Sequence, residues 1–268
     1  FSSTKSKLIR KGALWSWFIL LLHTQTKVPA IKPFLKSADK LDFETAYTYR
    51  LKKRKWLGFF GALKVETPLL AGFLVKEKDT KLKIIELDGK VDLTKTALGQ
   101  KAFELTSGFA PLILRQALGV SILPKDTKKL RIDIKIGGGF IQAFTQEGLR
   151  VDDDAATADL LELKRIQDYL QAGVEARIAI SGRLFKKSLS YSLVVGAMLP
   201  FYSSVTKVGD KEYSIPELLN FDLSLKIGIQ VLKWLAVNYS LNLTQAPLIQ
   251  PKLQVTNNLV LSVTWSIL

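Results

Sequence analysis

The feature that most constrains this chain is a strict alternation of apolar and polar residues over unusually long segments. Residues 130–140 read LRIDIKIGGGF, and residues 219–231 repeat the pattern as LNFDLSLKIGIQV. Successive side chains of a β-strand point to opposite faces, so this alternation predicts strands with one apolar and one polar face. A helix would scatter the charged residues around its circumference.

Segments of this kind cover most of the chain. Strands of soluble proteins usually run about 5–6 residues, whereas a strand that crosses an outer membrane needs ~9–11 residues and a strong tilt. The sequence therefore predicts an all-β fold, a transmembrane antiparallel up-and-down β-barrel of about ten strands. The expected strands are 13–26, 39–52, 55–68, 108–123, 129–143, 168–185, 188–202, 217–232, 234–245 and 252–267.

The expected connections alternate between short and long, as do the short periplasmic turns and long extracellular loops of bacterial barrels. We therefore expect one domain over residues 1–268, with 69–107 and 144–167 as long extracellular loops. Within the first loop, KLKIIELDGKVDL at 81–93 predicts a hairpin whose Asp88-Gly89 suits a type I′ turn. In the second, Asp152-Asp153-Asp154 before AATADLLELKRI predicts a capped short helix. The three aspartates are also a weak calcium candidate, but they lack the regular ligand spacing of a calcium loop.

The polar faces of the expected strands carry many charged residues. If these charged residues faced water, every apolar face would have to point into the interior, as in a soluble barrel around a wide lipid-binding cavity. In the membrane interpretation the same charges line the lumen, and their near balance predicts cross-strand ion pairs that fill a narrow barrel and leave little conductance. These residues are Asp42, Glu44, Arg50, Lys64, Glu66, Arg115, Arg131, Asp133, Lys135, Glu175, Arg177, Arg183, Asp222 and Lys226.

The tryptophans agree with the membrane interpretation, because each falls at the short-turn end of the expected barrel. Amphipathic aromatic rings favour the membrane interface, which predicts one interface belt of Trp15, Trp17, Trp56, Trp234 and Trp265. In the alternating pattern of their strands, Trp56 and Trp234 fall on positions that face the lumen, so we do not expect every ring to point outward. The opposite rim would use Phe109, Phe144, Phe201 and Tyr202.

The formal net charge is +15, and it concentrates in the expected short turns, KKRK at 52–55 and KDTKK at 125–129. A basic rim suits anionic lipid headgroups or an acidic periplasmic partner. No helix that would read a groove and no stacking-aromatic motif accompanies it, so we expect no nucleic-acid partner. The chain contains no cysteine, which excludes a disulfide scaffold. Its longest apolar run, 13–22, is too short for a transmembrane helix.

Several segments resemble a family of uncharacterised Gram-negative outer-membrane β-barrels known only as a domain of unknown function. The resemblance lies in Leu14-Trp15-Ser16-Trp17, in FLKSADKLDFETAYTYRL at 34–51, in WLGFFGALKVETPLLAGF at 56–73 and in LELKRIQDYLQAGVEARI at 161–178. It implies a bilayer of phospholipid and lipopolysaccharide as the main partner, and a barrel of about twelve strands if residues 1–11 belong to a preceding strand. The basic net charge and the final Ser-Ile-Leu are unusual for bacterial outer-membrane proteins, so a mitochondrial outer membrane is the alternative location.

We find no catalytic motif and expect no enzymatic activity, no cofactor and no metal. His23 is the only histidine, and a pairing with Ser188, Ser190 or Ser192 would be needed for a lipid-modifying enzyme. Gly137-Gly138-Gly139 lies inside a strand pattern and predicts a bend, not a phosphate loop. Three functions remain: a structural or docking barrel whose long loops bind other envelope proteins, a narrow channel for small solutes, and a lipid-modifying enzyme.

Overall fold

The computed structural model describes residues 2–10, 13–26, 35–152, 160–185, 188–208, 211–232 and 234–263. Over these residues the protein is all-β, and its little helical structure is of the 3₁₀ type, including the short turn η2 (Ile215–Leu218). None of the helical structure in the described segments has the length and apolar character needed to cross a membrane. The expectation of an all-β fold is confirmed.

The main sheet has eleven strands, and every neighbouring pair in it is antiparallel. All ten expected strands are present, and residues 2–10 add an eleventh at the N-terminal edge. In sheet order the strands are β1 (Ser2–Arg10), β2 (Ala13–Thr26), β3 (Leu35–Arg50), β4 (Leu57–Thr67), β10 (Leu112–Asp126), β11 (Arg131–Phe144), β14 (Tyr169–Leu184), β15 (Leu189–Ser203), β18 (Asn220–Leu232), β19 (Leu235–Ala246) and β20 (Gln250–Val263).

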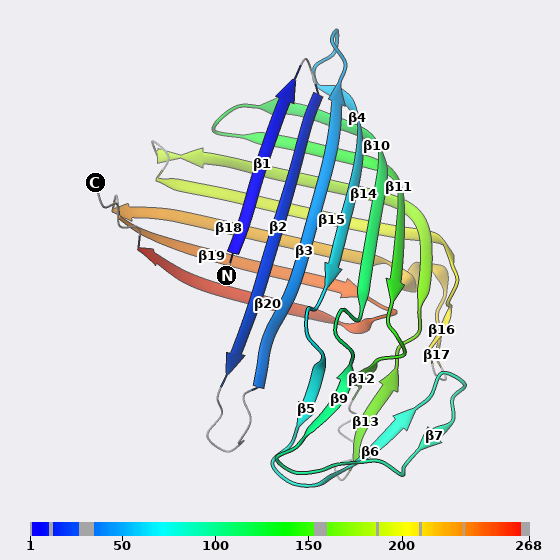
Figure 1. The fold of residues 1–268 in the computed structure, drawn as a ribbon. Coiled ribbons are helices and arrows are strands. Elements are labelled where there is room, and N and C mark those ends of the chain that lie inside the picture. The colour runs from blue at the N-terminus through cyan, green and yellow to red at the C-terminus, as the bar shows by residue number, and fades with distance from the viewer. Residues whose placement is uncertain are drawn as a thin grey trace.

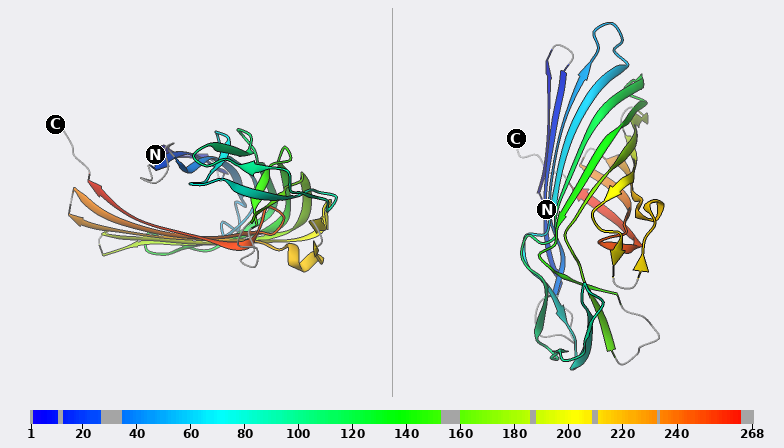
Figure 2. Two further views of the ribbon diagram at one scale, coloured as in Figure 1. Left: turned by 90° about the horizontal axis from the view of Figure 1, so that it is seen from below. Right: turned by 90° about the vertical axis from the view of Figure 1, so that its right-hand side faces the viewer.

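The sheet curls into a trough that is open along one side. Figure 1 shows β1–β3 running across the direction of β18–β20, and Figure 2 shows these two groups on opposite walls, joined through β10, β11 and β14. Among the described residues no pairing joins the edge strands β1 and β20. An odd number of alternating strands makes β1 and β20 run in the same direction, so pairing them directly would form a parallel contact.

A pair of glycines permits close approach of two strands in the middle of the sheet. Gly119 on β10 lies directly opposite Gly137 on β11. A Cβ added to Gly119 would lie 2.2 Å from the backbone oxygen of Ile136, and one on Gly137 would lie 2.0 Å from that of Leu118. Real Cβ atoms do not approach this closely, so only glycine fits this part of the curl.

The two longest connections fold into a small β-subdomain beyond one end of the main sheet (Figure 1). Its strands are β5 (Gly72–Val75), β6 (Thr80–Ile85), β7 (Val91–Asp92), β8 (Thr96–Ala97), β9 (Ala102–Thr106), β12 (Leu149–Val151) and β13 (Leu160–Arg165). Its buried core consists of Leu82, Ile84, Ala97, Leu149, Leu161 and Leu163. These connections are therefore a packed unit and not only solvated loops. Two shorter strands, β16 (Lys207–Val208) and β17 (Lys211–Glu212), lie in the connection before η2.

The structure corrects two local predictions in the β-subdomain. The expected helix after Asp152 is wrong over 160–165, because this segment is β13 and pairs in parallel with β6; Asp153 and Asp154 lie outside the described residues. The expected hairpin at 81–93 is confirmed, but only Gly89 has a positive φ (83°), whereas a type I′ turn needs two such residues. The Gly89 N–H donates to the Glu86 oxygen, as in a type I turn followed by a left-handed glycine.

Candidate functional site: a charged concave face and an apolar convex face

The fourteen charged residues expected to share one face do so in the observed register. Residues directly opposite on neighbouring strands point to the same side of a sheet. Asp42 lies opposite Glu66, and the row from Glu44 continues through Lys64 to Arg115. A second row runs from Lys135 through Arg177 to Gly196 and Asp222. The remaining members fall on the same face by parity: Arg50, Arg131, Asp133, Glu175, Arg183 and Lys226.

One ion pair identifies this face as the inner, concave one. A guanidinium nitrogen of Arg177 on β14 lies 3.5 Å from a carboxylate oxygen of Glu44 on β3. Three strands, β4, β10 and β11, separate β3 from β14 in the sheet. Two side chains so far apart in the sheet can meet only across the hollow of the trough.

Glu66 is the centre of a first cluster on the concave face. Its carboxylate lies 2.7 Å from the ammonium nitrogen of Lys40, 3.0 Å from that of Lys64 and 3.3 Å from Nε of Arg115. Asp42 adds contacts of 3.3 Å to Lys40 and 3.6 Å to Lys64. Lys40 was not among the predicted lumen residues, although it has the same parity on its strand as Asp42. The cluster brings three cations to two carboxylates that are themselves mostly buried.

Asp133 is the centre of a second cluster, nearer the short turns. Its carboxylate lies 3.6 Å from Arg50 and 3.8 Å from Arg131, and it accepts a hydrogen bond of 2.9 Å from the Ser121 hydroxyl. Arg50 also donates to the Ser121 backbone oxygen at 3.2 Å. The arginine is thereby fixed by both a charge and a backbone carbonyl, which restricts its rotamers.

The other predicted members lie on the concave face without forming one continuous network. Lys135 lies over the ring of Phe60, 5.2 Å from its centroid. Glu175 lies beside Gly139 and Asp222 lies beside Gly196, each so close that a Cβ on the glycine would contact the carboxylate. Arg183 is exposed, and Lys226 borders a hollow on the concave side of β15, β18, β19 and β20.

The convex face is apolar and largely exposed, the reverse of a soluble sheet that packs on its own core. Leu118 in the middle of β10 is 64% exposed, between two glycines on the adjacent strands. Soluble monomers rarely expose continuous apolar patches beyond a few hundred Å². Other exposed convex residues span most of the sheet: Ile19, Leu21, Tyr47, Tyr49, Phe59, Val120, Ile136, Phe140, Val174, Ile178, Leu199, Ile229, Val231, Leu259 and Leu261.

Four of the five predicted belt tryptophans can be located. Trp15 and Trp17 lie on the convex face near the short-turn end of β2, and the indole N–H of Trp15 donates to the Thr45 hydroxyl at 2.8 Å. Trp56 and Trp234 are exposed at the short turns. Trp265 lies outside the described residues. At the long-connection end Phe109, Phe144, Phe201 and Tyr202 are exposed.

The β-subdomain is held by its own ion pairs. Arg165 forms two hydrogen bonds with Glu86, one of them 2.9 Å from Nη2 to Oε1, and this contact lowers the pKa of Glu86. Lys83 lies 2.8 Å from Glu162, a pair that joins β6 to β13. These contacts link segments that are distant in the sequence and fix the parallel pairing of β6 with β13.

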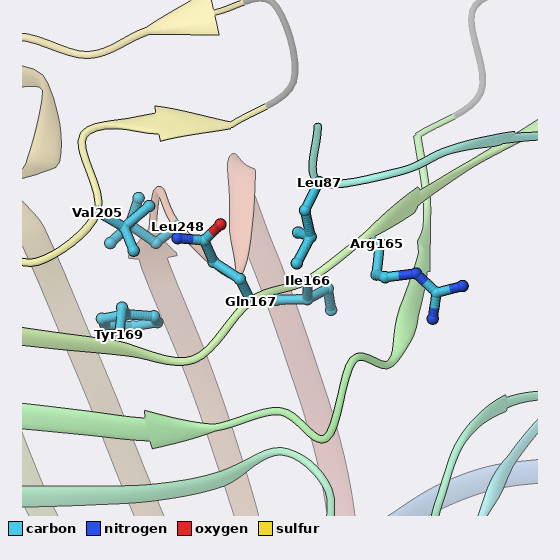
Figure 3. A pocket seen from close by; sticks show the side chains of 7 residues that line it. All are labelled: Leu87, Arg165, Ile166, Gln167, Tyr169, Val205 and Leu248. Carbon is cyan, nitrogen blue, oxygen red and sulfur yellow. The ribbon is translucent and has the colours of Figure 1, made fainter. Parts of the chain in front are cut away.

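The β-subdomain also contacts the main sheet at its long-connection end. Arg150 donates a 2.8 Å hydrogen bond to the backbone oxygen of Ile249, next to β20. Figure 3 shows Leu87 and Ile166 of the β-subdomain side facing the group formed by Tyr169, Val205 and Leu248. The cavity between them is about 10 Å³, which admits at most one water molecule. This junction is therefore a packing contact and not a ligand site.

An apolar cluster lies on the concave face at this end. Residues of β11, β14 and β15 pack there against the connections that carry η2 and the β19–β20 turn. The cluster comprises Ile141, Ala143, Tyr169, Met198, Val205, Tyr213, Leu218 and Leu248. Among these buried side chains Gln171 accepts a hydrogen bond of 2.8 Å from Asn220.

The residues considered for catalysis are not brought together. His23 lies near the long-connection end of β2, with Nδ1 3.8 Å from the Asp39 carboxylate. Ser188, Ser190 and Ser192 lie at the short-turn end of β15. The described part of the chain contains no cluster of three potential metal-ligating side chains. The sequence matches no protein-family model and no curated protein.

Proposed function

We propose that this chain is an integral protein of the bacterial outer membrane whose sheet encloses a charge-filled lumen and whose β-subdomain docks another envelope component. The observation that carries the proposal is the reversed polarity of the sheet. Exposed aliphatic and aromatic side chains cover its convex face, whereas carboxylates, lysines and arginines pair on its concave face. Acyl chains would remove the convex side chains from water, at roughly 25 cal/mol per Å².

Closure into a complete barrel belongs to the same proposal. Membrane-spanning sheets need closed edges, because unpaired backbone groups in hydrocarbon cost several kcal/mol each. The edge strands β1 and β20 run in the same direction, so closure requires either a parallel β1–β20 contact or a further strand between them. A further strand fits the expected larger barrel of about twelve strands and the resemblance to uncharacterised outer-membrane barrels.

The β-subdomain supports a docking role because it has its own packed core and carries exposed apolar residues away from its junction with the main sheet. Val91 and Leu98 are exposed although Leu82 and Ile84 fill the core beneath. A surface that is already folded loses little conformational entropy when it binds a partner. The ion pair of Arg165 with Glu86 stiffens the hairpin that presents Val91.

Membrane integration is tested by flotation of the protein with urea-washed liposomes and by heat-dependent mobility in a detergent gel. We expect the protein to float and to migrate differently before and after boiling. Docking is tested by a photo-crosslinking amino acid at Val91 in whole cells, with Leu118 as the control position. We expect one protein adduct from Val91 and lipid adducts from Leu118; protein adducts from Leu118 instead would oppose the proposal.

A narrow channel is the alternative function, and one observation favours it. The concave side of β18 and β19 carries hydroxyl and amide groups, among them Ser224, Asn238, Ser240 and Asn242. Such groups line a wall that water can wet. Planar-bilayer recording separates the two functions. A channel gives a steady conductance. A docking protein gives none, because ion pairs and the apolar cluster fill its lumen.

A further inference from the structure

A hollow of about 320 Å³ lies over β15, β18, β19 and β20, close to the short turns. One cross-strand row of the concave face passes through it, from Arg183 through Ser190 and Gly228 to Asn238. The next row places Ser192, Lys226 and Ser240 side by side. The volume falls at the lower end of the range of small-molecule sites.

Gly228 forms the floor of this hollow. A Cβ at this position would lie 2.7 Å from the Ser190 hydroxyl oxygen and 2.9 Å from Oδ1 of Asn238. The Nδ2 group of Asn238 donates to Ser262 at 3.1 Å, which turns its oxygen toward Gly228. Two hydrogen-bonding groups therefore converge over Gly228, and a larger residue at this position would push them apart.

The charge around the hollow is positive. Lys226 lines it directly, and Arg183 occupies the same row as Ser190 and Gly228. The described residues of the lining include no carboxylate. The nearest acidic residue on β18 is Asp222, two concave positions further along that strand. Hydroxyl and amide groups beside a cation match a ligand that carries several hydroxyl groups and one negative charge.

We infer that this hollow binds a small anionic polyol, such as a sugar acid or the glycerol phosphate headgroup of a lipid. Lys226 binds the anionic group, Ser190, Ser192 and Ser240 bind the hydroxyl groups, and Gly228 lets the side chains of Ser190 and Asn238 lie close together beneath the ligand. The inference does not depend on the docking role, because the site lies at the opposite end of the sheet from the β-subdomain.

The test is calorimetry on the detergent-solubilised full chain with four probes at constant ionic strength. Gluconate and glycerol 3-phosphate combine charge with hydroxyl groups, sorbitol has only hydroxyl groups, and acetate has only charge. We expect at least one of the first two to bind at least tenfold more tightly than sorbitol and acetate. Mixed micelles with phosphatidylglycerol form a separate arm: competition by these micelles identifies a lipid headgroup as the ligand, and no competition identifies a free solute.

Two variants locate the binding. Gly228→Val fills the hollow and should abolish binding, whereas the control Gly138→Val, on the convex face with open space around it, should not. Lys226→Gln should weaken the anionic probes at least tenfold and leave sorbitol unchanged, and it adds no bulk that could disturb folding. Equal binding by Gly228→Val and Gly138→Val, an unchanged affinity in Lys226→Gln, or no binding by either anionic polyol would overturn the inference.

Discussion

The substitution Leu118→Lys tests whether the convex face contacts lipid. Leu118 lies near the middle of β10, is 64% exposed, and faces Gly61 and Gly138 on the adjacent strands. A Cβ on either glycine would have nothing within 4 Å, so a lysine at position 118 meets no steric obstacle. The effect of the substitution therefore reports the solvent around the side chain.

The expected magnitude depends strongly on that solvent. A lysine on the lipid face at the bilayer midplane costs about 2–4 kcal/mol, which lowers the folded-to-unfolded ratio roughly 30- to 800-fold. An exposed residue in water changes stability by about 0.5 kcal/mol or less. Leu93→Lys is the matched control, because Leu93 is 59% exposed on the β-subdomain, outside the main sheet.

The assay is reversible urea unfolding in phospholipid vesicles, followed by tryptophan fluorescence. We expect Leu118→Lys to lose about 2–4 kcal/mol of unfolding free energy and Leu93→Lys to stay within about 0.5 kcal/mol of the wild type. If both variants unfold like the wild type, the convex face does not contact acyl chains.

Three further predictions concern single positions. Glu86→Gln should lower the stability of the β-subdomain by at most about 1 kcal/mol, as measured by hydrogen exchange in β6. Because Arg165 lowers the pKa of Glu86 below its ordinary 4.5, this stability difference should be present at neutral pH. It should vanish as the pH falls through the lowered pKa. Gly119→Val should destabilise the sheet by about 2 kcal/mol or more through its clash with β11, and Gly138→Val should not; equal urea midpoints would contradict the account of the curl. Leu82→Ala should cost about 2–5 kcal/mol locally and expose the β-subdomain to proteolysis; unchanged protection would mean that its core contributes little.

The sequence predicted the strands of the main sheet because their alternation is a local signal. In β11 and β18 the charged and apolar faces can be read from consecutive residues, and Asp133 and Lys226 fall on the expected face. Lys40 could have been found by the same parity rule, since it precedes Asp42 by two residues. The curl that brings Arg177 to Glu44 could not, because alternation does not specify how a sheet bends.

The β-subdomain was hidden for a different reason. The segment LLELKR has the spacing of an amphipathic helix, but it becomes β13 because β6 lies beside it and supplies a parallel partner. That contact joins Leu163 to Ile84, and no pattern within either segment indicates the other. The hollow at Gly228 could not be predicted either, because it is lined by residues of four strands whose relative register the sequence does not specify.

The most direct test of the central claim is a spin-label scan along β10, from Leu114 to Val120, in liposomes. The chain has no cysteine, so each single-cysteine variant carries one label at a known site. We predict that oxygen, which concentrates in acyl chains, reaches labels at the convex positions Leu114, Leu118 and Val120 preferentially, whereas a water-soluble nickel complex does not. Labels at the concave positions Arg115 and Ala117 should show low oxygen access; Gly119 is left unlabelled because no side chain fits there. Uniform access along the strand, or preferential nickel access at Leu118, would contradict a lipid-facing convex surface.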